Sequence, residues 1–400
     1  MLSVKKIPRR AAWSRRIELE TSALASTMIP RDALHRREAN DEDDRTARRA
    51  MKEVRLWIVG LGTVGQWLLR ALHEHAATLE GHYGFVPMVT GVASARDGFV
   101  QNADGLDPLI VLEHVSTRRP LIELPGVRHW QSAAEGLGAT EADVLVEVTP
   151  SPAERGEPGS THMREALRRG ISVVTSNKWP VALHGVELVE LAREQGVAFR
   201  AESTVMSGTP VLSTLVDGLA GTTPTAVRGI LNATANFILT RMEEGQSYEA
   251  ALSEAQDLGL AERDPTADVE GYDAMAKAMI LAGLVFGRQL RAGDVVRRGI
   301  SGIDRAQIKA ARAGGAHVKQ LVTVEFPRAD ASDFVARVEP AFLPPNDPLA
   351  SISGVVNAIV CRAKPVGEVV VTGPGAGPEL AGQGVFSDLI AVARRPISAC

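Results

Sequence analysis

The chain has 400 residues, of which 45% are hydrophobic and 23% are charged, a composition typical of a soluble globular protein. At about 100–200 residues per domain, this length predicts two or three domains that need no disulfide or metal for stability. The two cysteines, Cys361 and Cys400, give neither a disulfide framework nor a zinc site, and they suit a reducing compartment such as the cytoplasm. No segment approaches the roughly 20 apolar residues of a membrane span, so we expect no membrane association.

The first 50 residues differ in charge from the rest of the chain. They contain 12 of the 44 basic and 8 of the 48 acidic residues, so residues 51–400 carry 32 and 40, a net charge of −8. The basic, acid-free start is typical of a transit peptide, of an arm that contacts nucleic acid, or of a disordered tail. We favour a disordered or dispensable extension, with the working protein beginning near Met51. The acidic remainder argues against a nucleic-acid partner.

A buried strand followed by a glycine-rich turn marks the beginning of the expected folded region. The apolar run at 54–59 leads into the residues Gly60, Leu61, Gly62, Thr63, Val64 and Gly65, and an amphipathic helix is predicted over 66–79. In a dinucleotide-binding fold the first glycine forms the tight turn, the second lets the backbone approach the pyrophosphate, and the third packs the helix on the strand. The order strand, turn, helix therefore predicts an NAD(P) site rather than a simple glycine-rich turn.

The end of the second strand, predicted over 88–93, bears on cofactor preference. An NAD site usually has an acid there for the ribose 2′-hydroxyl, whereas an arginine can pair with the 2′-phosphate of NADP. Ser94 and Arg96 follow this strand, which favours NADP. Asp97 leaves NAD open, and a solvated loop arginine is an equally good interpretation of Arg96.

Two further strands, predicted over 144–149 and 171–175, end at the same edge of one parallel sheet, which is where ligands bind in such folds. Lys178 follows the second of them. It is either a surface lysine or a group aimed at the nicotinamide. Apolar residues then recur at helical spacing from Val181 onward, which predicts a helix that stops at Gly196.

The segment from 227 to 284 carries the strongest chemical signal. A strand at 227–231 precedes helices predicted over 237–244 and 247–258, and an acid-rich loop follows. Asp273 and Lys277 are four residues apart, so they share one face of a helix that is apolar enough to be buried. A buried lysine needs partners or a lowered pKa, whereas an exposed pair would contribute only a few tenths of a kcal/mol. We interpret this segment as a site in which acids hold a substrate ammonium group and a lysine transfers a proton.

These residues resemble the signature of the homoserine dehydrogenase family. The resemblance covers residues 54–394, and its main runs are GILNATANFIL at 229–239 and EAQDLGLAERDPTADVEGYDAMAK at 254–277. Shorter matching pieces are EVTP at 147–150, TSNK at 175–178, ESTV at 202–205, PLA at 348–350 and GPGAG at 373–377. The ordered set is highly specific, although no single piece is.

The resemblance implies an α/β fold with two working domains. These are a Rossmann-type dinucleotide-binding domain over 51–200, completed by 365–400, and an α/β catalytic domain with an open sheet over 201–364. The implied reaction is the NAD(P)-dependent interconversion of L-aspartate 4-semialdehyde and L-homoserine, which belongs to threonine and methionine biosynthesis. A homodimer is expected, formed through the regions around 201–210 and 320–364.

The resemblance also assigns roles to individual residues. Lys277 corresponds to the proposed proton donor, and Lys178 to a lysine that contacts both cofactor and substrate and shares that role. The implied substrate-binding residues are Glu262, Asp268, Asp273 and Thr234. The implied cofactor contacts beyond the glycine turn are Ser94, Arg96, Thr149, Lys178, Gly259 and Gly375. A lysine beside an aldehyde stabilises and protonates the oxygen on which charge develops after hydride addition.

The sequence departs from the family pattern at two places. Ala233 stands where the family commonly has glycine, which adds a methyl group close to the substrate or to the nicotinamide loop. Met206 interrupts a small-residue segment that, in the family, binds a monovalent cation. Na⁺ or K⁺ is therefore a candidate ligand of Glu202, Val205, Ser207 and Thr209, and a structural turn sealed by Glu202 is the other interpretation.

Other functions remain open to test. A regulatory domain of the kind that follows the catalytic region in many family members has no room here, so no such amino-acid site is expected. Oxidation of a semialdehyde through a thiohemiacetal would need an activated cysteine, and Cys361 has no histidine nearby in the sequence. An NADP-binding paralogue without turnover, or a dehydrogenase for a related small aldehyde, remain alternatives.

Overall fold

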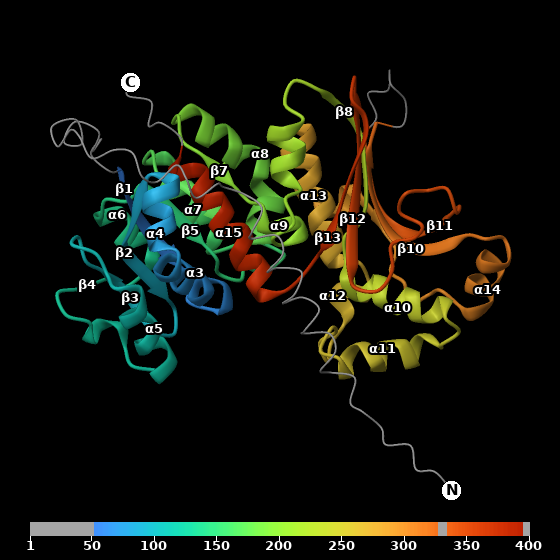
Figure 1. Cartoon of the computed structure of the whole chain (residues 1–400), viewed down its shortest axis with the longest axis horizontal. Coiled ribbons are helices and arrows are strands. Elements are labelled where there is room, and N and C mark those ends of the chain that lie inside the picture. The colour runs from blue at the N-terminus through green and yellow to red at the C-terminus, as the bar shows by residue number, and fades with distance from the viewer. Residues whose placement is uncertain (1–51, 327–333, 395–400) are drawn as a thin grey trace, which may run out of the picture. The chain divides into compact units, whose positions relative to one another are not determined.

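The computed structural model describes residues 52–326 and 334–394, which form two lobes of one unit (Figure 1). The expectations for residues 1–50 and for a start at Met51 lie outside the described residues. Within the described ranges, no helix is long and apolar enough to cross a membrane.

The first lobe is built on a seven-stranded sheet with the order β4-β3-β2-β1-β5-β6-β7. Five neighbouring strands, from β2 to β7, are parallel, and β3 and β4 are added antiparallel at one edge. The strands are β1 (Lys52–Val59), β2 (Phe85–Ser94), β3 (Gly98–Gln101), β4 (Arg128–His129), β5 (Val144–Glu147), β6 (Ser172–Thr175) and β7 (Phe199–Arg200). The strands expected in this half are therefore present as β1, β2, β5 and β6.

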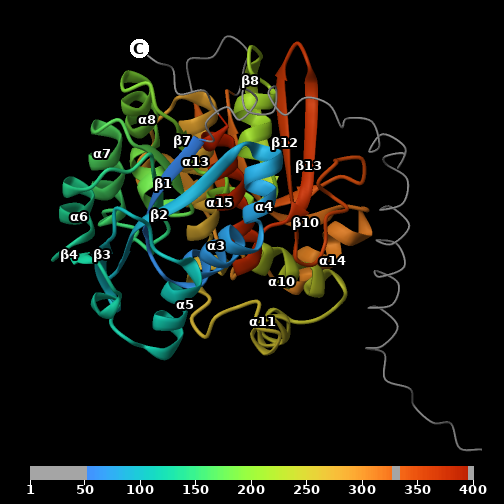
Figure 2. The same ribbon diagram turned by 60° about the vertical axis from the view of Figure 1, so that its left-hand side comes forward.

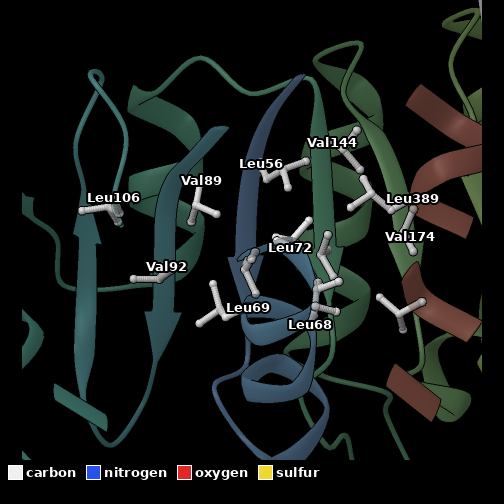
Figure 3. Packing of buried hydrophobic residues seen from close by; sticks show 14 of the residues in the cluster. Leu56, Leu68, Leu69, Leu72, Val89, Val92, Leu106, Val144, Val174 and Leu389 are labelled. Carbon is white, nitrogen blue, oxygen red and sulfur yellow. The ribbon is translucent and has the colours of Figure 1, made fainter. Parts of the chain in front are cut away.

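Helices cover both faces of this sheet, so its central strands are apolar on both sides. One face is covered by α3 (Thr63–Glu74), α5 (Pro108–Thr117) and α15 (Pro378–Ala393), and the other by α6 (Ala133–Ala139), α7 (Gly159–Arg168) and α8 (Lys178–Glu194). Figure 3 shows leucines of α3 packed against Leu56 of β1, with Leu389 of α15 in the same core. The N-terminal strand and the last described helix thus share one hydrophobic core.

The second lobe contains a six-stranded open sheet with the order β13-β12-β8-β10-β11-β9. All neighbours are antiparallel except β11 and β9. Its strands are β8 (Thr223–Ile230), β9 (Val295–Arg297), β10 (His317–Glu325), β11 (Val335–Leu343), β12 (Val356–Lys364) and β13 (Gly367–Pro374). Its helices are α9 (Ser203–Met206), α10 (Ala233–Glu243), α11 (Tyr248–Asp257), α12 (Thr266–Val269), α13 (Tyr272–Phe286) and α14 (Arg305–Ala313), and η4 (Ser213–Gly218) is a short π-helix.

The boundaries of two helices, α3 and α10, differ from those predicted. α3 begins at Thr63 and ends at Glu74, and α4 (Ala76–Thr78) and the π-helix η2 (Leu79–Tyr83) follow it instead of a continuous helix to residue 79. α10 begins at Ala233 rather than residue 237, because the Asn232 side chain accepts a hydrogen bond from the Ala235 amide at 2.8 Å and caps the helix. α15 begins at Pro378, since proline is favoured in the first turn of a helix.

The chain also returns to the first lobe at a different residue from the one predicted, which is 365. Residues 367–374 form β13, which pairs with β12 in the second sheet. Only α15, which starts four residues later, packs on α3 in the first lobe, and the two helices lie side by side in both views (Figures 1 and 2). The return therefore begins after Pro374 and not at residue 365.

Candidate active site

The glycine turn between β1 and α3 gives its three glycines different surroundings. Gly60 has a φ of +107°, and a Cβ there would lie 2.8 Å from the Val148 carbonyl carbon. A Cβ on Gly65 would lie 2.0 Å from the Gly60 oxygen, whereas one on Gly62 would meet nothing within 4 Å. Gly60 and Gly65 therefore permit the close packing of the turn, and Gly62 borders open space. No side chain caps the first amides of α3, which suits an anionic group.

The end of β2 carries a small hydrogen-bonded cluster. The Ser94 hydroxyl donates to Asp97 Oδ2 at 2.8 Å, and Arg96 donates from Nε to Oδ1 at 2.9 Å and from Nη2 to Oδ2 at 3.2 Å. The Asp97 side chain is only 4% exposed, whereas that of Arg96 is 65% exposed. Asp97 is thus already satisfied by protein donors, and Arg96 presents unused N–H groups to solvent.

A cavity of about 510 Å³ lies between the lobes and is lined by residues of both. It brings together Lys178, Lys277, Asp268, Asp273, Glu262, Thr234, Gly259, Gly375 and Val64 from the predicted set, along with Val205 and Ser207. The cavity is not lined by the other predicted site residues, namely Thr149, Ser94, Arg96, Glu202, Thr209 and the rest of the glycine turn. A smaller cavity of about 220 Å³ shares Lys178, Glu262, Asp268 and Asp273 with it.

The centre of this cavity is the carboxylate of Asp273, in the first turn of α13. Lys277 Nζ lies 2.8 Å from Asp273 Oδ2, and Lys178 contacts the other oxygen, Oδ1. Lys277 also donates to the carbonyl of Leu231, the residue directly after β8. Its side chain is 8% exposed and that of Lys178 is 37% exposed, so the two ammonium groups differ in their access to water.

Asn232 connects the acids of the site and was not predicted to do so. Its Nδ2 donates to Asp268 Oδ1 at 2.7 Å and to Asp273 Oδ2 at 3.0 Å, while its Oδ1 caps α10. The sequence signal was available, because asparagine directly before a helix is a preferred capping residue. The Thr234 hydroxyl donates to the Leu260 carbonyl at 2.8 Å, which ties α10 to the acid-rich loop.

The electrostatics of the cluster follow from burial and from the two lysines. Burial alone would raise the pKa of Asp273, but the charges of Lys178 and Lys277 hold it well below its usual value. The charge of Asp273 raises the pKa of Lys178 above that of an ordinary lysine. Burial lowers the pKa of Lys277 despite the same carboxylate. Burial likewise raises the pKa of Asp268, and the neighbouring charge of Asp273 adds to this.

Glu262 differs from the other acids of the site. It is exposed, it lines the cavity, and no hydrogen bond or ion pair of its carboxylate occurs among residues 52–326 and 334–394. Asp268 and Asp273, in contrast, already accept hydrogen bonds from Asn232. A carboxylate without a protein partner at the edge of a cavity is available to a cationic group of a ligand.

Of the four residues expected to bind a cation, Glu202, Ser207 and Thr209 have side chains with other partners. Glu202 accepts hydrogen bonds from the amides of Val211, Leu212 and Ser213 at 2.6–2.7 Å, at the beginning of η4. The hydroxyls of Ser207 and Thr209 donate to the carbonyls of Gly375 and Pro374, at 3.3 and 2.9 Å respectively. These side chains therefore have hydrogen-bond partners within the protein and need no ion. This arrangement agrees with the interpretation of a structural turn sealed by Glu202. No cluster of three or more His, Cys, Asp or Glu suited to a metal occurs in the described part of the chain.

Cysteine chemistry receives no support at this site. Cys361 is buried in β12, and burial raises the pKa of its thiol to about 11, so the nucleophilic thiolate is disfavoured. Cys400 lies outside the described residues. The thiohemiacetal alternative therefore has no activated thiol in the part of the chain that the structure describes.

Comparison with known proteins identifies the relatives of this chain. Residues 210–390 match the family model described as homoserine dehydrogenase, and residues 60–202 match its NAD-binding domain. The chain is 40% identical over 340 residues to an NAD(+)-dependent homoserine dehydrogenase of Pseudomonas canavaninivorans, covering 85% of this chain and 96% of that protein. It is 37% identical over 334 residues to a homoserine dehydrogenase of Methanocaldococcus jannaschii, covering 83% and 96%.

Solved structures give the same result. A putative homoserine dehydrogenase from Archaeoglobus fulgidus has a TM-score of 0.74 and 32% identity, covering 85% of this chain and 99% of that one. A hyperthermophilic archaeal homoserine dehydrogenase in complex with NADPH has a TM-score of 0.71 and 31% identity, covering 86% and 99%.

Proposed function

Since this chain belongs to the homoserine dehydrogenase family, we propose that it interconverts L-aspartate 4-semialdehyde and L-homoserine with NAD(P). The observation that carries the proposal is the pair of lysines on one carboxylate, Asp273, facing a cavity between the cofactor lobe and the second lobe. A carbonyl reduction needs positive charge and a proton at the oxygen, and this cluster supplies both.

The first lobe fits a dinucleotide cofactor. The open space at Gly62 and the uncapped amides of α3 suit a pyrophosphate, and the cavity begins next to them at Val64. When bound, the nicotinamide supplies the hydride for reduction and accepts it for oxidation. The protein must therefore hold the aldehyde carbon in the cavity and manage the proton on its oxygen.

Lys277 is the better candidate for the proton donor. Its lowered pKa makes its ammonium group a stronger acid than an ordinary lysine, whereas Lys178 is held in the charged state by Asp273. In reduction, an Nζ–H proton of Lys277 passes to the alkoxide oxygen, and the neutral amine is later reprotonated from solvent. Lys178 stabilises the developing negative charge without losing its proton.

The acids that line the cavity suit the substrate ammonium group. The Glu262 carboxylate has no hydrogen-bond or ion-pair partner in the described part of the chain, and Asp268, which lines the same cavity, accepts a hydrogen bond from Asn232. Ala233 lines the same cavity, so its methyl group narrows the space available to a substrate. This methyl group is the reason to test related small aldehydes beside aspartate semialdehyde.

Arg96 favours NADP over NAD. The only acid next to this position, Asp97, accepts three hydrogen bonds from Ser94 and Arg96, so a ribose 2′-hydroxyl would have to displace one of them. Arg96 is fixed by the same bonds while its remaining N–H groups stay free for a 2′-phosphate. We propose no step that depends on a monovalent cation, because Glu202, Ser207 and Thr209 already have partners.

We also propose that the protein acts as a homodimer. Exposed apolar side chains on and beside β12 and β13 support this, namely Val355, Val356, Val366 and Val370. Sedimentation velocity on the full chain tests it, and a monomer at micromolar concentration would contradict it.

The function is tested by following oxidation of NADPH in the presence of aspartate semialdehyde. Wild type is expected to turn over, and Lys277→Ala and Lys178→Ala are expected to lose about 10²- to 10⁴-fold in kcat. Lys309→Ala, which removes an exposed lysine of α14, is the matched control. Binding of NADPH without turnover of any aldehyde would indicate an NADP-binding paralogue that is not an active enzyme. Turnover of a related small aldehyde but not of aspartate semialdehyde would show that the proposed substrate is wrong.

A further inference from the structure

A buried network of polar side chains lies behind the lysine of the first lobe. Glu147, the last residue of β5, is fully buried, and its Oε1 accepts hydrogen bonds from both the amide and the hydroxyl of Thr149. Its Oε2 lies 2.6 Å from Nδ1 of His162, which is in α7 and 7% exposed. An imidazole with its proton on Nδ1 can donate to this carboxylate oxygen. Glu147 and His162 do not line the cavity.

The network continues from Thr149 to the residue before Lys178. Asn177 donates from Nδ2 to the Ser151 hydroxyl at 2.8 Å and to the Thr149 hydroxyl at 3.4 Å. The backbone N–H of Asn177 donates at 2.9 Å to the Thr175 hydroxyl. That hydroxyl in turn donates at 2.7 Å to the backbone carbonyl of Glu147. Together these bonds connect the residue before α8 to the ends of β5 and β6 and to the loop that follows β5.

The side chain of Asn177 does not make the hydrogen bond that is usual for a residue in its position. Asn177 is the N-cap residue of α8, yet its side chain makes no capping hydrogen bond to that helix. An asparagine in this position normally contributes about 1 kcal/mol by capping. The amide group is instead directed at the loop after β5. Gly159 of α7 leaves the room for it, since a Cβ there would lie 2.6 Å from Asn177 Nδ2.

We propose that Glu147 and His162 are positioning residues of this active site, which hold Thr149 and Asn177 and through them the backbone from which Lys178 projects. The proposal rests on the function proposed above. Lys178 is the first residue of α8 and reaches Asp273 across the cavity. A shift of its backbone therefore changes how it meets Asp273 and a substrate oxygen. Misplacement of a catalytic group by about 1 Å can cost about 100-fold in rate.

The test compares two substitutions of His162 with one of another buried histidine. His162→Leu removes the donor to Glu147, and His162→Asn restores one close to the position of Nδ1. His114→Leu is the matched control, because His114 is also buried in the first lobe and, among the described residues, its side chain bonds only the Pro120 carbonyl, at 3.3 Å. Thr175→Val, which is close in volume, removes one bond to Asn177 and serves if His162→Leu does not fold.

We expect His162→Leu to lower kcat about 10- to 100-fold, with a smaller change in KM for NADPH. His162→Asn should remain within about threefold of wild type, since its amide replaces the donor. His114→Leu should lower the melting temperature but keep kcat. Hydrogen–deuterium exchange of the segment 173–179 should be faster in His162→Leu and in Thr175→Val, and unchanged in His114→Leu.

Unchanged kcat in His162→Leu, or a loss of kcat without faster exchange at 173–179, would overturn the proposal. Failure of the proposed function gives a different result, because wild type itself would then not oxidise NADPH with aspartate semialdehyde. In that case the exchange of 173–179 alone decides whether Glu147 and His162 hold this backbone.

Discussion

Lys178 and Lys277 contact different oxygens of one carboxylate, that of Asp273. Two positive groups thus share one negative group, and the Lys277 side chain is 8% exposed whereas that of Lys178 is 37% exposed. Charging both lysines at once is unfavourable, and the more buried one, Lys277, is the one whose pKa is lowered. This asymmetry assigns charge stabilisation to Lys178 and proton transfer to Lys277.

The pH dependence of reduction should change in Asp273→Asn. Lys277 must be protonated to act as an acid, so kcat for reduction falls as pH rises through its pKa. Removing the carboxylate removes the attraction that partly opposes the effect of burial, so this pKa falls further and the alkaline limb moves to lower pH. The measurement is kcat for aspartate semialdehyde reduction between pH 6 and pH 10. Asp257→Asn, in an exposed position at the end of α11, is the control, and identical profiles for the two variants would contradict the assignment.

Substitutions of two glycines in the β1–α3 turn should have different effects, one on cofactor binding and the other on stability. Gly62→Ala places its methyl group in open space, so we expect an unchanged melting temperature and an affinity for NADPH weakened at least about tenfold, because the backbone no longer approaches the pyrophosphate. Gly65→Ala forces a Cβ against the Gly60 carbonyl and should destabilise the protein by about 1–3 kcal/mol. NADPH fluorescence titration and thermal unfolding are the measurements. If Gly62→Ala binds NADPH as wild type does, no pyrophosphate lies at this turn.

Arg96→Ala should change cofactor preference. Loss of the hydrogen bonds to a 2′-phosphate should reduce kcat/KM for NADPH by about 10- to 100-fold and leave kcat/KM for NADH almost unchanged. Arg70→Ala, on an exposed position of α3, is the control. Equal effects on the two cofactors would show that Arg96 does not discriminate between them. The NAD(+)-dependent relative makes this outcome worth testing.

Asp388 should make the stability depend on pH near neutrality. Burial raises the pKa of this α15 carboxyl to about 7, and it faces Glu202, Arg200 and Asp217. The unfolded carboxyl loses its proton near pH 3.8, so between pH 3.8 and 7 the folded state holds the extra proton and stability falls as pH rises. Asp388→Asn does not titrate and can still accept from the Glu202 amide.

The variant should therefore gain stability over wild type as pH rises, by about 4 kcal/mol at most above pH 7. Urea unfolding at pH 5 and at pH 8.5 measures the difference, with the exposed Asp104→Asn as control. A difference that is the same at both pH values would mean that Asp388 is ionised throughout.

A feature of this fold could be predicted from the sequence when all the residues that form it lie in one short segment. The strand, glycine turn and helix at β1 and α3 are contiguous, and the pair Asp273 and Lys277 lies within one helical turn, so their type and mutual position followed from spacing alone. The capping function of Asn232 is equally local, since asparagine directly before a helix is a preferred capping residue, although the sequence pattern predicts the start of this helix only at residue 237.

The features that the sequence did not predict depend on contacts between distant residues. The pairing of β13 with β12 is decided by which sheet offers a free edge, and nothing in the residues 367–374 specifies that edge. Glu147 and His162 are 15 residues apart, and only the packing of α7 on β5 brings them within 2.6 Å. The partners of Glu202 likewise appear only once the chain has turned back at η4.

The placement of α15 has a consequence for how the protein is made. Val385, Phe386 and Leu389 complete the core of a lobe whose first strand begins at Lys52. Synthesis from the N-terminus thus leaves that core open to solvent until more than 300 further residues have been translated. The cofactor lobe cannot mature on the ribosome ahead of the second lobe, and a nascent chain halted before residue 378 should expose apolar surface that chaperones bind.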